Sequence, residues 1–199
     1  MSMFSSQWFA STGASAYLLE QSLLGDGTSS YLNRTPSVAG NRKTWTWSCW
    51  FKGTPVSSSF LAVEANDANG PQMDIAFQGG ANTNEFEVYG YSSSYDFRLL
   101  TSSLYRDSSA WYHIVVAMDT TQATASNRTK IYINGTQVTS FGTADYPTLN
   151  YDTGINALKE HFVMKGPGAG GYVNGAVALP ILVDGSALAP TAFGETDDD

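Results

Sequence analysis

One pair of carboxylates in the sequence could approach the separation that glycoside hydrolysis requires. Glu85 and Glu87 lie two residues apart in a segment of alternating polar and apolar residues, so a β-strand would place both on one face. Retaining glycosidases use two carboxyl groups about 5–5.5 Å apart, one as nucleophile and one as acid and base. The competing interpretation is a pair of exposed strand carboxylates without a catalytic role.

A second group of candidates consists of tyrosines near polar turns. An aromatic face can stack on a sugar ring, while the tyrosine hydroxyl donates or accepts a hydrogen bond. The same amphipathic side chain also suits a protein–protein contact, and both interpretations stay open. The candidate ligand-binding residues are Tyr89, Tyr91 and Tyr95 in one short segment, and Tyr146 and Tyr151 in a later predicted loop.

Metal binding has weaker support in the sequence. Asp26, Asp152 and Asp184 fall in predicted turns or strand ends and are candidate Ca²⁺ ligands, since calcium takes six to eight oxygen ligands. No D-x-D-x-D-G loop is present, which favours carboxylates that are merely solvated in turns. His113 and His161 occur in no HxH or HExxH pattern, so we expect no transition-metal site.

β-Strands must position these residues, because polar and apolar residues alternate with a period of two along most of the chain. Asn134-Gly135 between two alternating runs predicts a type I′ hairpin. Many short strands separated by turn residues are typical of an all-β sandwich or barrel. The clearest predicted strands are 44–52, 72–78, 85–91, 111–119 and 130–138, and weaker ones are 17–24, 60–64, 97–101, 162–165 and 172–183.

The alternation also predicts which residues fill the core. Cys49, the only cysteine, lies within an apolar run, so we expect a small buried side chain and not a nucleophile. The residues expected to form the structural core are Trp45, Trp47, Phe51, Trp111, His113, Ile131 and Ile133.

Composition limits the domain count and the partners. A chain of 199 residues fits one domain, which we place at 17–196, after an uncharged N-terminal extension (1–16) that could serve as an anchoring arm and before an acidic tail (197–199). Its net charge of −8 and its scattered basic residues argue against nucleic acid. The longest apolar run, 176–183, contains Pro180 and is far shorter than the ~20 residues of a membrane span.

Two segments resemble a known fold family. Trp111-Tyr112-His113, followed by Ile131-Tyr132-Ile133-Asn134-Gly135, is similar to the paired signature of laminin-G-like, concanavalin A-type domains. The resemblance implies a jelly-roll sandwich of two antiparallel sheets, with His113 as a structural, hydrogen-bonded residue. Hydrolases of this fold carry the pattern E-x-D-x-x-E. Here Phe86 lies between the two glutamates and Tyr89 and Gly90 follow, so we expect no catalytic residues and no enzyme activity.

Residues 30–36 with 40–46, and residues 183–195, are similar to stretches in structural proteins of tailed bacteriophages, especially marine ones. This resemblance implies a non-enzymatic virion surface protein, made in the host cytoplasm. It would be a capsid decoration or head-fibre component that contacts other virion proteins, as a homo-oligomer and without a cofactor, Ca²⁺ being the one open candidate. The alternative is a tail-fibre or adhesin domain that binds host-surface carbohydrate, and a glycan-active hydrolase is a second alternative.

Overall fold

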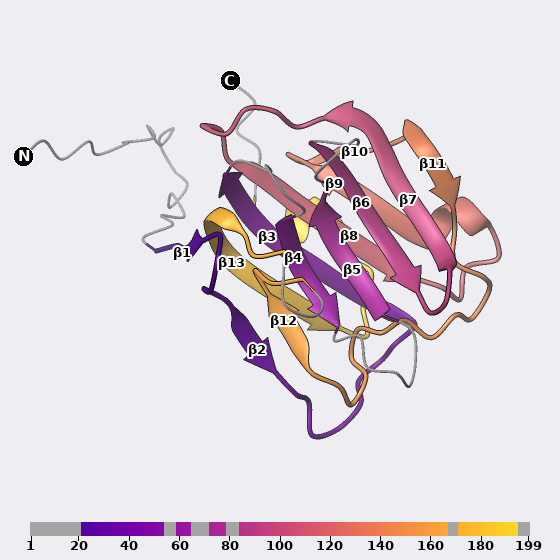
Figure 1. The fold of residues 1–199 in the computed structure, drawn as a ribbon. Helices are drawn as coiled ribbons and strands as arrows, with labels where there is room; N and C mark the ends of the chain where they lie inside the picture. Colours follow the sequence, from indigo (N-terminus) through magenta and orange to yellow (C-terminus); the bar gives the residue numbers. More distant parts are fainter. Residues whose placement is uncertain (1–20, 54–58, 65–71, 79–83, 167–170, 195–199) are drawn as a thin grey trace, which may run out of the picture.

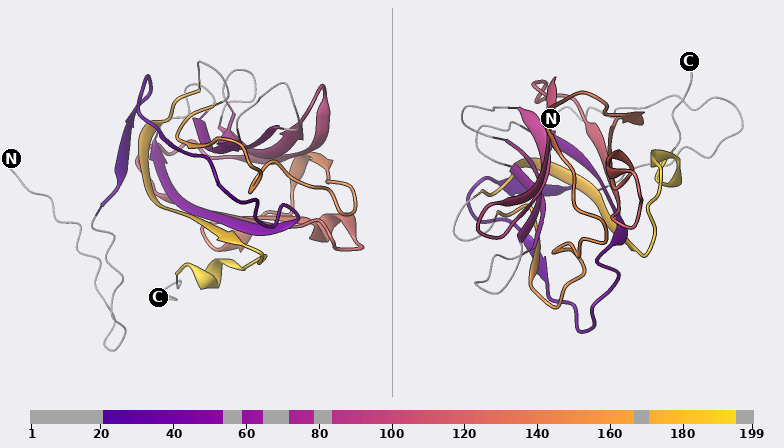
Figure 2. Two further views of the ribbon diagram at one scale, coloured as in Figure 1. Left: turned by 90° about the horizontal axis from the view of Figure 1, so that it is seen from below. Right: turned by 90° about the vertical axis from the view of Figure 1, so that its right-hand side faces the viewer.

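The computed structural model describes residues 21–53, 59–64, 72–78, 84–166 and 171–194. These residues form antiparallel β-strands in two sheets, together with short 3₁₀ turns at Ala125–Asn127 and Pro190–Ala192. Figure 1 shows the two sheets one behind the other, and Figure 2 shows them edge-on as two layers. The predicted all-β sandwich of two antiparallel sheets is confirmed.

The first sheet has six strands. Their order is β1 (Leu23–Asp26), β13 (Asn174–Asp184), β3 (Thr44–Gly53), β8 (Tyr112–Asp119), β9 (Thr129–Ile133) and β10 (Thr136–Gln137). The predicted Asn-Gly hairpin joins β9 to β10, with φ of 50° at Asn134 and 77° at Gly135. The segment after β13 lies against the outer face of this sheet, where Thr46 Oγ1 donates to the Ser186 carbonyl at 2.7 Å (Figure 2).

The second sheet has seven strands. Their order is β11 (Phe141–Asp145), β7 (Tyr95–Leu104), β6 (Glu85–Tyr91), β5 (Gln72–Phe77), β4 (Ser59–Glu64), β12 (His161–Val163) and β2 (Leu32–Arg34). Of the predicted strand at 17–24, residues 17–20 lie outside the described residues, and β1 begins at Leu23. Residues 1–16 and 197–199, for which we predicted an arm and a tail, lie outside the described residues. No helix in the described part of the chain is long and apolar enough to cross a membrane.

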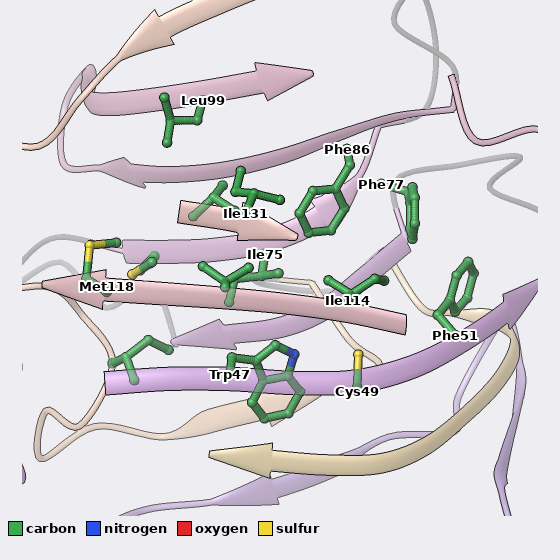
Figure 3. Packing of buried hydrophobic residues seen from close by; sticks show 14 of the residues in the cluster. Trp47, Cys49, Phe51, Ile75, Phe77, Phe86, Leu99, Ile114, Met118 and Ile131 are labelled. Atoms are coloured by element: carbon green, nitrogen blue, oxygen red, sulfur yellow. The ribbon is translucent and has the colours of Figure 1, made fainter. Parts of the chain in front are cut away.

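The core lies between the sheets, where alternate residues of each strand face inward. Trp45, Trp47, Cys49 and Phe51 of β3 are all buried, and Figure 3 shows three of them opposite side chains of the second sheet, Phe77 among them. Burial raises the pKa of the Cys49 thiol to about 12, so the thiol stays protonated. The predicted burial of Trp45, Trp47, Phe51, Ile131 and Ile133 is confirmed.

His113 is buried too, but on the outer face of the six-stranded sheet and not between the layers. Its ring stacks on Trp50 with centroids 4.7 Å apart, and its Nε2 lies 3.1 Å from Ser48 Oγ. Burial lowers its pKa, so the neutral ring is favoured, and the predicted hydrogen-bonded role is confirmed. The prediction for Trp111 is wrong, because it precedes β8, shares the outward parity of His113 and is 37% exposed.

Candidate functional site

A group of polar and aromatic side chains covers the outer face of the seven-stranded sheet. We call it the outer-face cluster. Its members are Gln72 and Asp74 of β5, Glu87, Tyr89 and Tyr91 of β6, and Tyr95 and Arg98 of β7.

Strand register brings the cluster together. Asp74 lies opposite Tyr89, and Tyr89 lies opposite Arg98, so three neighbouring strands contribute to one row. The residues next to them in sequence, such as Ile75 and Val88, belong to the core. Because side chains alternate between the two faces of a strand, filling the core with these apolar residues directs the polar row outward.

The three tyrosines predicted from the Tyr89–Tyr95 segment are in contact. The Tyr95 ring lies 5.3 Å from that of Tyr89 and 5.6 Å from that of Tyr91, with interplanar angles of 85° and 81°. The Arg98 guanidinium carbon lies 4.7 Å from the centroid of the Tyr95 ring. Tyr95 remains 48% exposed, whereas Tyr89 and Tyr91 are half-buried. The arrangement presents one aromatic ring to solvent and supports it with three neighbours.

The Arg98 side chain is fixed by an ion pair with Glu87. Arg98 Nε and Nη2 donate to Glu87 Oε2 at 3.0 and 2.8 Å, and Glu87 is fully buried. Glu87 Oε1 has no hydrogen-bond partner among the described residues. Burial raises the pKa of the Glu87 carboxyl, and Arg98 opposes that rise. The expectation of two exposed glutamates is therefore wrong for Glu87, which an arginine on the next strand covers.

Asp74 anchors the other side of the cluster. Its carboxylate is fully buried and accepts a hydrogen bond from Gln72 Nε2. Burial raises the pKa of Tyr89, and the hydrogen-bonded Asp74 carboxylate adds to the effect. The Tyr89 hydroxyl therefore stays protonated and is fixed as a donor toward Asp74.

Tyr146 and Tyr151 do not join the cluster, which corrects their grouping with the other candidates. Both pack against the hydrophobic core. The Tyr151 ring lies 5.6 Å from that of Phe97, and its hydroxyl donates to Asp96 Oδ2 at 3.0 Å. The reason is that the loop after β11 turns inward and covers the end of the core, which the sequence of the loop did not indicate.

The three predicted calcium ligands are not brought together either. Asp26 lies opposite Asn174 at the start of β13, whereas Asp184 is the last residue of β13. Ten residues of strand separate these two ends, about 33 Å. Among the described residues, no three His, Cys, Asp or Glu side chains form a group that could hold a metal ion.

Each of these aspartates, where its contacts are described, has a local structural role. The Asp26 carboxylate accepts hydrogen bonds from Ser29 Oγ and from the following backbone amides, and these hydrogen bonds lower its pKa. Asp184 Oδ1 accepts from Asn41 N at 2.7 Å and from Asn156 Nδ2 at 2.9 Å. Asp152 contributes its backbone carbonyl to Arg42 at 3.4 Å.

Three members of the cluster, Gln72, Asp74 and Arg98, were not predicted as site residues. The alternation of strand 72–78 placed Asp74 outward, but nothing in its own segment indicated Tyr89 as a partner. Arg98 fell in one of the weaker predicted strands. Its pairing with Glu87 depends on the register between β6 and β7, which contains two irregularities.

A profile of a known protein family matches most of the chain. The profile described as the concanavalin A-like lectin/glucanases superfamily (Laminin_G_3) matches residues 26–178. No protein with a curated description matches the sequence.

Solved structures support the same architecture. Domains LG4-5 of the mouse laminin α1 chain have a TM-score of 0.57 and 11% identity over 88% of this chain and 44% of the laminin chain. Domain 4 of AbnA, an arabinanase from Geobacillus stearothermophilus solved with arabinotriose, has a TM-score of 0.52 and 16% identity over 85% of this chain and 68% of its own. A SAP-like pentraxin from Limulus polyphemus also scores 0.52, with 13% identity over 84% of this chain and 77% of its own.

At these identities the solved structures show a shared fold and nothing more specific, and that fold is the laminin-G-like jelly roll expected from the sequence. The profile match spans most of the chain and includes both sheets. The chain therefore belongs to the concanavalin A-like lectin/glucanase superfamily.

Proposed function

We propose that this protein binds carbohydrate, without transforming it, through the outer-face cluster. The observation that carries the proposal is the Tyr95 ring, which is 48% exposed and supported by Tyr89, Tyr91 and Arg98. A fixed aromatic ring of this kind offers a stacking surface at little cost in conformational entropy, because its neighbours already hold it in place.

Polar groups around the ring would orient the sugar. Among the described residues, Arg98 donates through Nε and Nη2, both to Glu87, which leaves Nη1 for a ligand hydroxyl. The exposed serines 92–94 adjoin Tyr91 and Tyr95. Membership of a superfamily named for lectins and glucanases supports the proposal.

The absence of catalysis is part of the same proposal. A nucleophilic carboxylate must reach the anomeric carbon of the sugar, but Glu87 is fully buried and committed to Arg98. Glu85, which is half-buried, would then lack its partner. The proposed site contains no metal ion, because the candidate ligands Asp26 and Asp184 lie beside opposite ends of β13.

The first prediction tests the stacking surface. Tyr95→Ala should weaken glycan binding by about tenfold, or ~1.4 kcal/mol, since one aromatic contact is lost. Binding is measured on immobilised neutral, amino and acidic glycans in the presence of EDTA, followed by calorimetry on the best ligand and chromatography for released products.

Tyr31→Ala is the matched control, because Tyr31 is 41% exposed and immediately precedes β2, at the opposite side of the same sheet. Equal losses for both variants, or no glycan binding by the unmodified protein, would contradict the proposal. Product release that Glu87→Gln abolishes would show that the protein is an enzyme.

We propose a virion-surface location for this binding domain, as the resemblance to phage structural proteins implies. In the fold, the two phage-like stretches are in contact, because Asn41 N donates to Asp184 Oδ1 at 2.7 Å. They therefore act as one structural unit. In this proposal the partners are other virion proteins and further copies of the chain, and decoration protein, head fibre and tail fibre are its competing forms.

The location leads to a second prediction. A gold-labelled antibody against this protein should decorate the heads or tail fibres of intact tailed-phage particles in electron micrographs. Particles from a phage that lacks the gene serve as the control for nonspecific labelling. Protein found only free in the lysate, with unlabelled particles, would exclude the virion role and leave carbohydrate binding untouched.

A further inference from the structure

An apolar groove of about 550 Å³ opens at the side of the sandwich where β2 and β12 lie near β13. In Figure 1 these strands lie together, next to β1. Its apolar lining comes from both sheets and from the segment after β2, and includes Leu32, Val38, Trp47, Phe162, Pro180 and Leu182.

The rim of the groove is unusually exposed for such side chains. Leu32 is 45% exposed, Leu182 40% and Val38 77%. Leaving this much apolar surface in water is unfavourable by about 25 cal/mol per Å². Apolar side chains this exposed beside one groove are suited to contact a further apolar segment.

Two polar side chains of the groove, those of Asn156 and His161, already have partners, whereas the buried Trp47 Nε1 has no hydrogen-bond partner among the described residues. Asn156 Nδ2 donates to Asp184 Oδ1 and to the Asn41 carbonyl, each at 2.9 Å. His161 Nε2 accepts from Asn156 N at 3.1 Å, and its Nδ1 lies 2.8 Å from the Lys159 carbonyl. A polar small molecule would therefore gain little from Asn156 and His161, and a mainly apolar segment with a backbone carbonyl to accept from Trp47 Nε1 suits the groove better.

The backbone beside the groove can still pair. β2 is the last strand of its sheet and pairs with β12 on one side, and no described strand pairs with its other side. An edge strand next to an apolar groove accepts an extended segment, whose backbone pairs with the edge and whose side chains enter the groove.

The chain itself contains a segment with the required chemistry. Residues 1–16 carry no charged side chain and include Met3, Phe4, Trp8 and Phe9. Burying them would therefore desolvate no side-chain charge. Twenty residues precede the described part of the chain, enough to span about 66 Å when extended.

The direction of β1 fits this occupant. β1 runs antiparallel to β13, with Asp26 opposite Asn174 and Leu23 opposite Val177. Going backwards along β1 therefore leads toward the later part of β13, where Pro180 and Leu182 line the groove. We propose that this groove is the docking site of residues 1–16 of the same chain.

Hydrogen exchange of the full-length chain, read by mass spectrometry, tests the docking. Amides of residues 1–16 should exchange at least about tenfold more slowly than those of the free peptide. Leu32→Asp should abolish this protection, because it places a charge in the groove. Val38→Asp, outside any strand, should do the same and covers the case in which the first substitution disrupts β2.

Leu104→Asp is the matched control, because Leu104 is 42% exposed at the end of β7 and does not line the groove; it should leave the protection intact. Free-peptide exchange in the unmodified protein would overturn the proposal. So would protection that appears only as the protein concentration rises by about a hundredfold, since the occupant would then belong to a second copy. Neither result bears on glycan binding at Tyr95.

Discussion

Trp47→Ala should lower the free energy of unfolding by about 3–5 kcal/mol. The Trp47 side chain is 5% exposed and belongs to the cluster between the sheets, as Figure 3 shows. Its removal loses the burial of a large aromatic ring and leaves a cavity that the surrounding strands can fill only in part. Urea denaturation followed by circular dichroism measures the change.

Trp111→Ala is the natural control, because Trp111 is 37% exposed and lies before the start of β8. We expect a loss below about 1 kcal/mol for this variant, as for most surface substitutions. Similar losses for the two variants would mean that β3 does not supply the central layer of the core.

The comparison of these two tryptophans shows what the sequence could predict. Trp47 lies in the middle of a long alternating run, where the period of two determines the inward face without knowledge of any partner strand. Trp111 lies at the end of such a run, and its burial depends on whether another segment covers it. Alternation predicts which side chains share a face, but it does not predict which faces of a strand are covered.

The outer-face cluster illustrates the same limit. The contact among Tyr89, Tyr91 and Tyr95 is local, since a short hairpin brings the residues together, and the sequence already grouped the three as candidates. The pairing of Glu87 with Arg98 depends on a register that shifts twice between β6 and β7. Tyr151 depends on a loop that packs across the core through Phe97. Interactions of both kinds arise from the tertiary fold, and spacing along the chain carries little information about them.

Arg98→Met should be the second strongly destabilising substitution, with a loss of about 3 kcal/mol at neutral pH. Methionine keeps much of the side-chain volume and removes the guanidinium that donates two hydrogen bonds to Glu87 Oε2. Removing one partner of a buried ion pair leaves an uncompensated charge, which typically costs about 3–5 kcal/mol. We expect a loss near the lower end of this range because the Arg98 side chain is 18% exposed.

A double substitution separates the lost ion pair from lost packing. Glu87→Gln with Arg98→Met removes both charges, so we expect it to recover about half or more of the stability lost in Arg98→Met. If the double variant is no more stable than Arg98→Met, the guanidinium acts mainly through its packing on Tyr95.

The pH dependence gives the same ion pair an independent signature. Burial raises the folded-state pKa of Glu87, so this carboxyl binds a proton more readily in the folded than in the unfolded chain. The contribution of this proton binding to folding stability is fully present below the unfolded-state pKa of Glu87. It is lost as pH rises through the folded-state pKa of Glu87. Without Arg98, which opposes the shift, that pKa rises further. The stability lost in Arg98→Met should therefore be smallest at acidic pH, where the carboxyl is protonated in both proteins, and should grow as pH rises, by about 1.4 kcal/mol for each additional unit of pKa.

His113 and His161 have the opposite effect on stability, because burial lowers the pKa of both. They are present in both proteins, so their contributions cancel when the stability of Arg98→Met is subtracted from that of the unmodified protein at each pH. A deficit that stays constant across the range would show that Glu87 is solvated or neutral in both proteins. The Tyr95 ring would then be held by its contacts with Tyr89 and Tyr91 and not by the ion pair.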